Sequence, residues 1–571
     1  MYLQTVKSKN AISYYAAKTV YENGKKTSKI VEKLGTLAEL STLYDDPTLY
    51  LKQRISELTE QEKNQTREVV VRFAQSECIE ANEQKKFNCG YLFLQALYHE
   101  LGLDRICKDI SARYEFEYDL DAILSRLIYG RILFPGSKLS TMKESYRLLE
   151  EPNFELHQIY RALEVLAKET DFIQAELYKN SLSVVGRNTK VLYYDCTNFF
   201  FEAEEEAGLR QYGVSKEHRP NPIVELGLFM DGDGLPLAFC VNPGNTSEQL
   251  TLKPLEKKII KDFENSEFVV CTDAGLSSSA NRKFNSIMGR SFITVQSIKK
   301  MKGFQQEWAL SCEGWKLADE PGIFDLNQIL SERDKYRDRV FYKEDWFCEN
   351  GLEQRYIVTF SIKYMEYLRH IRERQIQRAQ KAIDTGAVSR KRANDPNRFV
   401  GQLYFTEDGQ IAEHRAFSLD QDAIHAEEIF DGFYCVATNL EGPVETILKA
   451  NQRRWEIEES FRILKSEFHS RPVYLSRDDR ILAHFTTCFL ALTLFRILES
   501  RLRDRFTASQ LVQVLRGMEL YKIDGEGYIP TYTRDAITDA LHETFGFRTD
   551  YKINSLQAVK KILKSTKRVK H

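Results

Sequence analysis

The pattern of apolar and polar residues divides the chain into strand-like and helical segments. Two strand-like runs, 12–21 and 27–34, surround Asn23-Gly24, a strong signal for a β-hairpin turn. From Asp46-Pro47 onward, apolar residues recur at helical spacing, with Asp46 as the predicted cap and Pro47 at the first helical position. These patterns predict a β-hairpin element over residues 1–45 and a helical domain over residues 46–186.

The helical domain contains a candidate DNA reader. The segments Ser137–Ser140 and His157–Leu166 fit a helix-turn-helix arrangement. Short helices joined by a Pro-Gly turn are also common without any DNA, so both interpretations stay open.

After Gly186 the pattern changes to short strands. Val191–Tyr194 leads to Asp195, two further runs flank the turn at Asp231–Gly234, and after a helical stretch Phe268–Thr272 leads to Asp273. Antiparallel hairpins followed by a crossover predict a mixed α/β sheet.

A long segment separates Asp273 from the next helix of interest, which contains Glu458. Its strand-like runs around a basic helical run predict an inserted β-rich domain. The tail is mixed and mostly helical. The predicted divisions after the helical domain are a first part of the core at 187–298, the insertion at 299–445, a second part of the core at 446–500 and a helical C-terminal region at 501–571.

Composition excludes several classes of protein. Apolar residues make up 42% and the formal net charge is −2, which argues against a uniformly basic coat for nucleic acid. Any DNA contact must therefore use local patches, and a charge run is more often only a solvated face. The candidate patches are Lys216–Arg219, with Lys216 and Arg219 as its cations, the run Arg369–Arg392 and the tail Lys560–Lys570.

The ten cysteines show no zinc-ligand spacing and no disulfide framework. No signal segment is evident, and the most apolar stretch, Phe485–Phe495, is short for a membrane span and better suited to a buried helix. The prediction is a cytoplasmic protein without a membrane partner.

Three acids carry the candidate chemistry: Asp195, Asp273 and Glu458. Taken singly, Asp195 fits a buried paired carboxylate and Asp273 fits an ordinary turn or helix cap. Two strand-end acids and one acid on a returning helix also converge at one sheet edge, where carboxylate oxygens suit Mg²⁺ or Mn²⁺. Two such ions would clamp a phosphodiester for phosphoryl transfer.

The helix around Glu458 places charges beside the acid. Arg454 lies four residues before Glu458 and Lys465 seven after it, so an α-helix would put all three on one stripe. Glu456 and Glu459 would point elsewhere. The plainer interpretation is an amphipathic helix with ordinary spaced salt bridges.

These segments resemble the DDE transposases of bacterial insertion sequences, in the insertion-sequence-four superfamily with a tyrosine-arginine-glutamate-lysine signature. The resemblance rests on Tyr194–Thr197, Cys271–Gly275 and Arg454–Glu458 with Lys465, and on two further segments, Gly213–Lys216 and Pro243–Thr246. The position of the signature tyrosine holds Asn451.

The resemblance implies a ribonuclease-H-like catalytic core with a β-rich insertion, preceded by a mostly helical N-terminal domain and followed by a helical C-terminal region. Asp195, Asp273 and Glu458 would hold two Mg²⁺ or Mn²⁺ ions. Arg454 and Lys465 would grip phosphates of the transposon end, with Asn451 able to donate a similar hydrogen bond. Trp455 either packs on the insertion or stacks on an unpaired base.

The function implied is a transposase that binds its terminal inverted repeats, pairs two ends as a homodimer, cleaves them and joins them to target DNA, associated with the bacterial nucleoid when bound. Three rivals remain: a ribonuclease-H-like nuclease without strand transfer, a domesticated DNA-binding protein without catalysis, and a glycosidase using two carboxylates.

Overall fold

A computed structural model describes residues 2–8, 12–22, 25–44, 46–64, 80–388, 395–405 and 414–568, with the single positions 69, 71, 76 and 78. The chain forms two compact units, Met1–Glu83 and Gln84–His571. The predicted turn at Asn23-Gly24 lies outside the described residues, as do parts of the basic runs at 369–392 and 560–570.

The first unit is a three-stranded antiparallel sheet with two helices. Its elements are β1 (Tyr2–Lys7), β2 (Ile12–Glu22), β3 (Lys25–Thr36), α1 (Leu37–Leu43) and α2 (Pro47–Asn64). As predicted, Asp46 caps α2, and its carboxylate accepts from the Thr48 amide at 2.9 Å. Leu51 and Leu58 of α2 share one apolar core with Leu34. The first boundary therefore lies near residue 83 and not at the predicted 45/46, because α2 packs on this sheet.

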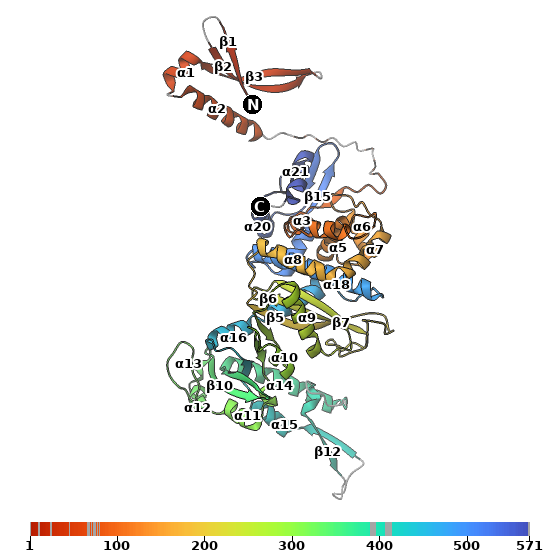
Figure 1. The fold of residues 1–571 in the computed structure, drawn as a ribbon, viewed down its shortest axis with the longest axis vertical. Coiled ribbons are helices and arrows are strands. Elements are labelled where there is room, and N and C mark those ends of the chain that lie inside the picture. Colours follow the sequence, from red (N-terminus) through yellow and green to blue (C-terminus); the bar gives the residue numbers. More distant parts are fainter. Residues whose placement is uncertain are drawn as a thin grey trace. The chain divides into compact units, whose positions relative to one another are not determined.

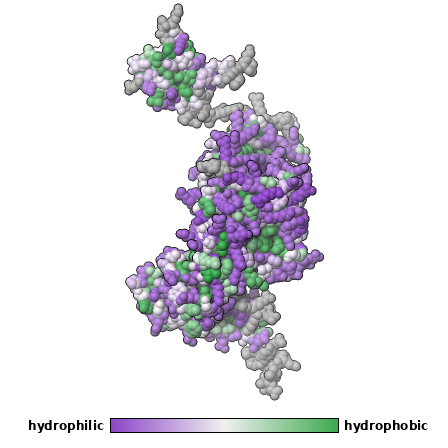
Figure 2. Space-filling view, in the orientation of Figure 1, coloured by the Kyte–Doolittle hydropathy of each residue, from purple (hydrophilic) through white to green (hydrophobic). Residues whose placement is uncertain are grey.

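The second unit has a helical part (Figure 1). The helix α18 (Asp478–Arg501) contacts α7, α5 and α3 and also strand β7 of the central sheet. It is long and apolar enough to cross a membrane, yet 89% of its apolar window is buried inside the protein. The face in Figure 2 is largely hydrophilic over this part, as expected when the apolar helix is internal. The other helices of this part are α3 (Tyr91–Glu100), α4 (Leu103–Ser111), α5 (Leu120–Leu133), α6 (Lys138–Ser145), α7 (Leu156–Lys168), α8 (Thr170–Val184), α19 (Ala508–Gly517), α20 (Ala536–Phe545) and α21 (Leu556–Thr566).

A small sheet ties the two ends of this unit together. Its order is β17-β16-β15-β4, so the early strand β4 pairs with β15 and thereby joins a sheet of three late strands. The region beyond residue 501, predicted to be helical, thus also supplies strands. The bounds are β4 (Lys86–Asn88), β15 (Glu519–Ile523), β16 (Gly527–Pro530) and β17 (Asn554–Ser555).

The central sheet has eight strands in the order β10-β11-β14-β9-β8-β5-β6-β7. The hairpin strands β5, β6 and β7 are antiparallel, whereas β5, β8 and β9 run parallel to one another. The mixed α/β sheet predicted from the strand order is confirmed. The bounds are β5 (Val191–Phe200), β6 (Ile223–Asp231), β7 (Pro236–Pro243), β8 (Val269–Thr272) and β9 (Ser291–Val295), with α9 (Glu248–Asp262) and α10 (Ser279–Phe284) as crossovers.

The segment predicted as a β-rich insertion extends this same sheet through β14, β11 and β10. It also has its own apolar core, which surrounds the buried Trp315. Only β12 and β13 pair apart from the central sheet among the strands described in this segment. Its elements are η1 (Ile298–Lys300), α11 (Gly303–Leu310), α12 (Leu326–Ser331), α13 (Arg333–Tyr336), β10 (Phe341–Glu349), β11 (Leu352–Phe360), α14 (Ile362–Asp384), η2 (Pro396–Phe399), β12 (Val400–Phe405), β13 (His414–Leu419), α15 (Gln421–Glu428) and β14 (Phe433–Thr438).

After β14 the chain returns through α16 (Val444–Gln452) to α17 (Trp455–Arg462), which packs against β5. A π-helical turn, η3 (Ile463–Glu467), follows directly. This return places α17 beside the strand that carries Asp195.

Candidate active site

Asp195 and Asp273 stand on neighbouring parallel strands. The pairing of β5 with β8 ends at Tyr193 opposite Cys271, and each aspartate lies two residues further along its strand. Neighbouring strands are about 4.8 Å apart, so the two carboxylates come together where β8 stops. The sequence had placed Asp195 at a strand end, which is wrong for β5 as a whole: the strand continues to Phe200 because its antiparallel pairing with β6 continues.

The electrostatics of Asp195 reflect this neighbour. Burial raises the pKa of Asp195 to about 6, and the Asp273 carboxylate adds to that rise, whereas Lys216 and Arg454 oppose it. The Cys196 amide donates to the Asp195 carboxylate at 2.8 Å. Ionising Asp195 is costly because it is buried and lies beside Asp273, so a cation bound near the two carboxylates would be stabilised.

Asp273 begins a tight turn after β8. Its carboxylate accepts from the Leu276 amide at 3.0 Å, and a Cβ added at Gly275 would lie 3.3 Å from both carboxylate oxygens. The glycine therefore keeps the approach to this acid open. The Asp273 carbonyl accepts from the Thr294 hydroxyl at 3.1 Å, which ties the turn to β9.

Of the three glutamates on α17, Glu458 is the one left facing outward. Glu456 pairs with Arg496 and Glu459 pairs with Arg462. The Glu458 side chain is 61% exposed and contacts Arg454 at 3.5 Å. Arg454 also favours the charged form of Asp195, so it lies near both Glu458 and Asp195. The described structure does not bring the carboxylate oxygens of Asp195, Asp273 and Glu458 within 4.8 Å of one another.

Lys465 reaches the site along a different path from the one predicted. An α-helix would stack it over Glu458, but the π-helical turn η3 changes the angular spacing, and its amine donates to the Thr197 hydroxyl at 2.7 Å. Thr197 stands two residues after Asp195 on the same face of β5. Burial lowers the pKa of Lys465 to about 8, and Lys216 adds to this, so the two amines share one neighbourhood.

The other four predicted DNA contacts lie in four different environments. Lys216 donates to the Cys196 carbonyl at 2.6 Å, which places it beside Asp195. Arg219 lies over the Phe200 ring at 4.1 Å. Trp455 is 56% exposed and does not pack into a core. Asn451 is buried, and its amide donates to the Tyr434 hydroxyl at 3.0 Å, so it is already engaged within the protein.

A cavity of about 650 Å³ reaches Gly275, two residues after Asp273, and Lys216, which contacts the Cys196 carbonyl. It is lined by Gly275 and by the two further segments that carried the resemblance, around Gly213 and Gly244. These segments touch backbone to backbone: a Cβ at Gly213 would lie 1.8 Å from the Gly244 carbonyl oxygen. Both glycines are needed for this wall.

Residues 201–494, more than half of the chain, match the family described as "Transposase DDE domain". This chain is a member of that transposase family. The match includes Asp273 and Glu458 and begins six residues after Asp195. No curated protein matches the chain.

Two solved structures of other transposases show a weak likeness. The "Cryo-EM structure of piggyBac transposase synaptic complex with hairpin DNA (SNHP)" is 8% identical over 85% of each chain, with a TM-score of 0.35. The "Mos1 transposase paired-end complex with left transposon end" is 14% identical over 40% of this chain and 63% of that chain, with a TM-score of 0.13. At these TM-scores neither likeness bears on the site of the family member described here.

The cavity near Gly275 also contains two acids that the sequence analysis did not single out. Burial raises the pKa of Glu225 to about 8, and Glu248 adds to this. Both glutamates line the cavity next to Lys216, which pairs with Glu248 at 2.7 Å. Glu225 is the charged residue inside β6, whose other acid, Asp231, ends the strand, and that interior position was the available signal.

A second group with metal-ligand chemistry lies far along the chain, at Asp539, His542 and Asp550. Its carboxylates already have guanidinium partners: Arg534 pairs with Asp539 at 2.7 Å and Arg548 with Asp550 at 2.6 Å. This cluster is accounted for as an ion-pair network of the C-terminal helices.

Proposed function

We propose that this protein is a DNA transposase that binds the terminal inverted repeats of its element, cleaves the DNA in a metal-dependent reaction and joins the freed 3′ ends to target DNA. The observation that carries the proposal is the placement of Asp195 and Asp273 two residues beyond the last paired position of the parallel strands β5 and β8, within a transposase-family chain. The strand order β7-β6-β5-β8-β9 supports a ribonuclease-H-like core, and the motifs support the insertion-sequence-four group of bacterial elements.

The donor set fits a divalent ion. Asp195 and Asp273 offer carboxylate oxygens at one sheet edge, and the raised pKa of Asp195, from burial and then from Asp273, is a penalty that a cation would relieve. Asp195, Asp273 and Glu458 would hold the Mg²⁺ or Mn²⁺ ions. Such ions, when bound, activate the attacking oxygen and stabilise the leaving oxygen in phosphoryl transfer.

The chain's own residues position the DNA. Lys465 and Arg454 present cations beside the acids, and we assign to them the phosphates that flank the scissile bond. The exposed indole of Trp455 is suited to stacking on an unpaired base. Pairing two transposon ends requires two active sites, so the proposed partners are DNA and a second copy of the chain.

The test uses inverted repeats recovered from the DNA that flanks the gene. The full chain with Mg²⁺ should nick these ends and yield joined products, whereas Asp195→Ala, Asp273→Ala and Glu458→Ala should each abolish both reactions without loss of DNA binding. Glu445→Gln, an exposed change on α16, is the control.

The alternative functions named in the sequence analysis predict different DNA products in this assay. Cutting without joined products favours the nuclease. Unchanged activity in Asp195→Ala would overturn the assignment of the acids.

A further inference from the structure

A basic pocket of about 220 Å³ lies in the helical part of the second unit. It is formed by Arg131 of α5, by Lys138 at the start of α6, by the segment 469–475 and by His484 of α18. Of the described residues that line it, none is acidic. His469 and Tyr474 are exposed, so the pocket has an open side.

Two of the basic side chains in this pocket, Arg131 and Lys138, are buried and have no acidic partner among the described residues, whereas Arg471 pairs with Glu217. Lys138 is 5% exposed, and no acid in the described part of the chain pairs with it. Burial lowers the pKa of Lys138 to about 7, Arg131 adds to this, and no carboxylate opposes it. The buried guanidinium of Arg187, by contrast, pairs with Asp231 at 2.9 Å. An unpaired buried cation is costly unless an anion is supplied.

The position of Arg131 is fixed by hydrogen bonds, and one of its N–H donors has no partner among the described residues. Its guanidinium donates to the carbonyls of Phe468 at 3.1 Å and His469 at 3.3 Å, while its buried Nε has no partner among the described residues. It is 5% exposed. These backbone contacts fix the plane of the guanidinium, and a fixed, under-used guanidinium is a good ligand for an oxyanion.

The start of α6 adds to the same charge. Ser137 caps the helix and accepts from the Ser140 amide at 3.1 Å, so the first turn of an eight-residue helix directs its amides toward this region. The positive end of a helix favours an anion.

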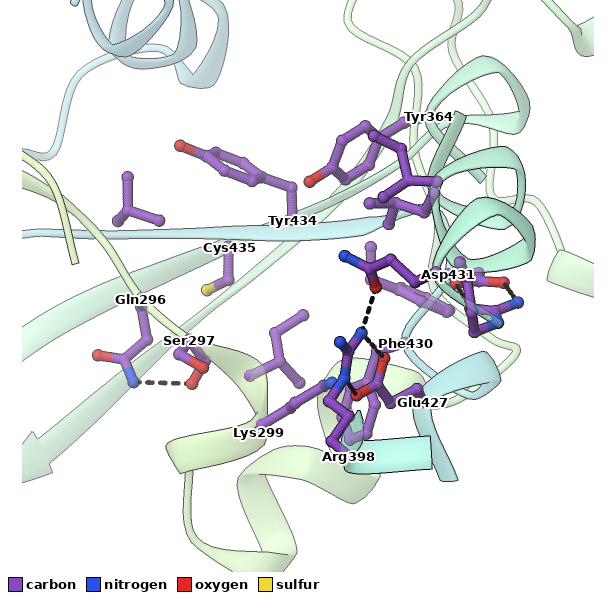
Figure 3. A pocket seen from close by; sticks show the side chains of 17 residues that line it. Gln296, Ser297, Lys299, Tyr364, Arg398, Glu427, Phe430, Asp431, Tyr434 and Cys435 are labelled. Carbon is purple, nitrogen blue, oxygen red and sulfur yellow. Dashed lines mark hydrogen bonds and ion pairs between the residues drawn. The ribbon is translucent and has the colours of Figure 1, made fainter. Parts of the chain in front are cut away.

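The larger pocket in Figure 3 shows the contrast. There Arg398 pairs with Glu427 at 2.7 Å, and Arg372 pairs with Asp431 at 2.6 Å, so its main cations already have their acids. The pocket at Lys138 lacks this internal neutralisation.

We propose that the pocket formed by Arg131 and Lys138 binds a phosphate group, supplied by the backbone of the DNA that enters the active site. The DNA source rests on the proposed transposase function. The pocket connects to the acids: Arg471 at its edge pairs with Glu217, which also attracts Lys465 at 3.7 Å. The Val473 amide donates to the Phe200 carbonyl at 3.0 Å, five residues along β5 from Asp195. That strand length is about 17 Å, or about five nucleotide steps of one DNA strand.

The test compares Lys138→Met with Lys143→Met, an exposed change on the same helix. The full-length proteins are titrated with a fluorescent duplex at several salt concentrations. Lys138→Met should weaken binding about 5- to 10-fold near 0.1 M salt and reduce the salt slope by about one, as expected for one lost phosphate contact. Lys143→Met should leave both unchanged.

A second measurement uses thermal melting in place of DNA binding. Inorganic phosphate should raise the Tm of the wild-type protein above that in chloride of equal ionic strength, and this rise should be absent in Lys138→Met. If phosphate raises the wild-type Tm but Lys138→Met binds DNA normally, the site takes free phosphate, and the DNA source is overturned. Equal DNA affinity in both proteins together with no phosphate-dependent rise overturns the pocket itself.

The transposase proposal and the phosphate pocket are tested by different outcomes. If the wild-type protein binds no DNA, the transposase proposal is lost, while the melting series in phosphate still decides the pocket.

Discussion

At the scale of single residues, the charge on Asp195 links stability to metal. Its pKa is raised to about 6 from 3.8, by burial first and then by Asp273. Because the folded pKa of Asp195 is above its unfolded value, this carboxyl destabilises the fold when it is charged. Its effect on the free energy of unfolding is most favourable below the unfolded pKa, and this advantage is lost as the pH rises through about 4 to 6. Above pH 6 the metal-free protein therefore carries a charging penalty.

Asp195→Asn should consequently stabilise the metal-free protein at pH 7.5 by about 1–3 kcal/mol and make little difference at pH 4. Mn²⁺ should then raise the Tm of the wild type but not that of the variant. Thermal melting at the two pH values measures both effects. Asp109→Asn, an exposed change on α4, is the control. A variant that is no more stable at pH 7.5, or that still responds to Mn²⁺, would contradict this account of the site.

Gly244 is a second position where one residue decides the site. A Cβ there would lie 2.2 Å from the Ile223 carbonyl oxygen and 2.5 Å from that of Gln211. Gly244→Ala must push apart the wall of the cavity that reaches Gly275, at a cost of about 1–3 kcal/mol in unfolding free energy. DNA cleavage should fall at least tenfold. Gly186→Ala, where a Cβ would meet nothing within 4 Å, should change neither Tm nor cleavage; equal effects of both changes would refute the packing argument.

At the scale of elements, the π-helical turn η3 decides where Lys465 lies. The turn carries its amine to Thr197 on β5, next to Asp195. Lys465→Met should reduce end cleavage about 10- to 100-fold with a smaller loss of end binding, because the amine acts beside the acids. Lys449→Met, an exposed change on α16, should have no effect on cleavage. The measurement is single-turnover cleavage with separate binding titrations; loss of binding alone would move Lys465 out of the active site.

The same elements show what the sequence could and could not predict. The apolar runs before Asp195 and Asp273 correctly predicted β5 and β8, because a buried parallel pair needs continuous apolar residues. The choice of Glu458 over its neighbours followed from helical spacing and stays a prediction; in the structure Glu456 and Glu459 pair with Arg496 and Arg462. The continuation of β5 to Phe200 and the π-helical turn depend on partners that are distant in the chain, so local periodicity did not reveal them.

Buried polar partners were equally hidden from the sequence. The pairing of Asn451 with the Tyr434 hydroxyl joins α16 to β14, and the counter-ion that Lys138 lacks becomes evident only once its neighbours are placed. Both features arise from tertiary contacts and not from spacing along the chain.

At the scale of the whole molecule, strand pairing between distant segments set the domain boundaries. The helical pattern from Asp46 onward suggested one continuous domain, but α2 supplies Leu51 and Leu58 to the core of the first unit. The β-rich segment extends the central sheet through β14, because β9 leaves an edge that an antiparallel strand can pair with. Strand pairing of this kind depends on residues that are far apart in the sequence, so the local pattern of apolar residues does not predict it.

This organisation predicts where the chain can be cut. A protein beginning at Gln84 keeps β4, whereas one beginning at Tyr91 loses it. In β4 the Asn88 side chain donates to the carbonyls of Leu515 at 2.9 Å and Arg516 at 3.0 Å, and the strand pairs with β15. Removing β4 leaves these buried acceptors without donors, at about 1–3 kcal/mol each, and exposes an edge strand.

The protein starting at Gln84 should therefore melt cooperatively and retain the rise in Tm with Mn²⁺, because the first unit has its own core. The protein starting at Tyr91 should lose at least about 3 kcal/mol of unfolding free energy or aggregate, since two or more buried groups lose their partners. Melting curves and gel filtration of the two proteins decide the matter. If both melt alike, β4 adds nothing to the second unit; if the longer one also fails to fold, the first unit is part of its stability, and the division at Glu83 is wrong in energetic terms.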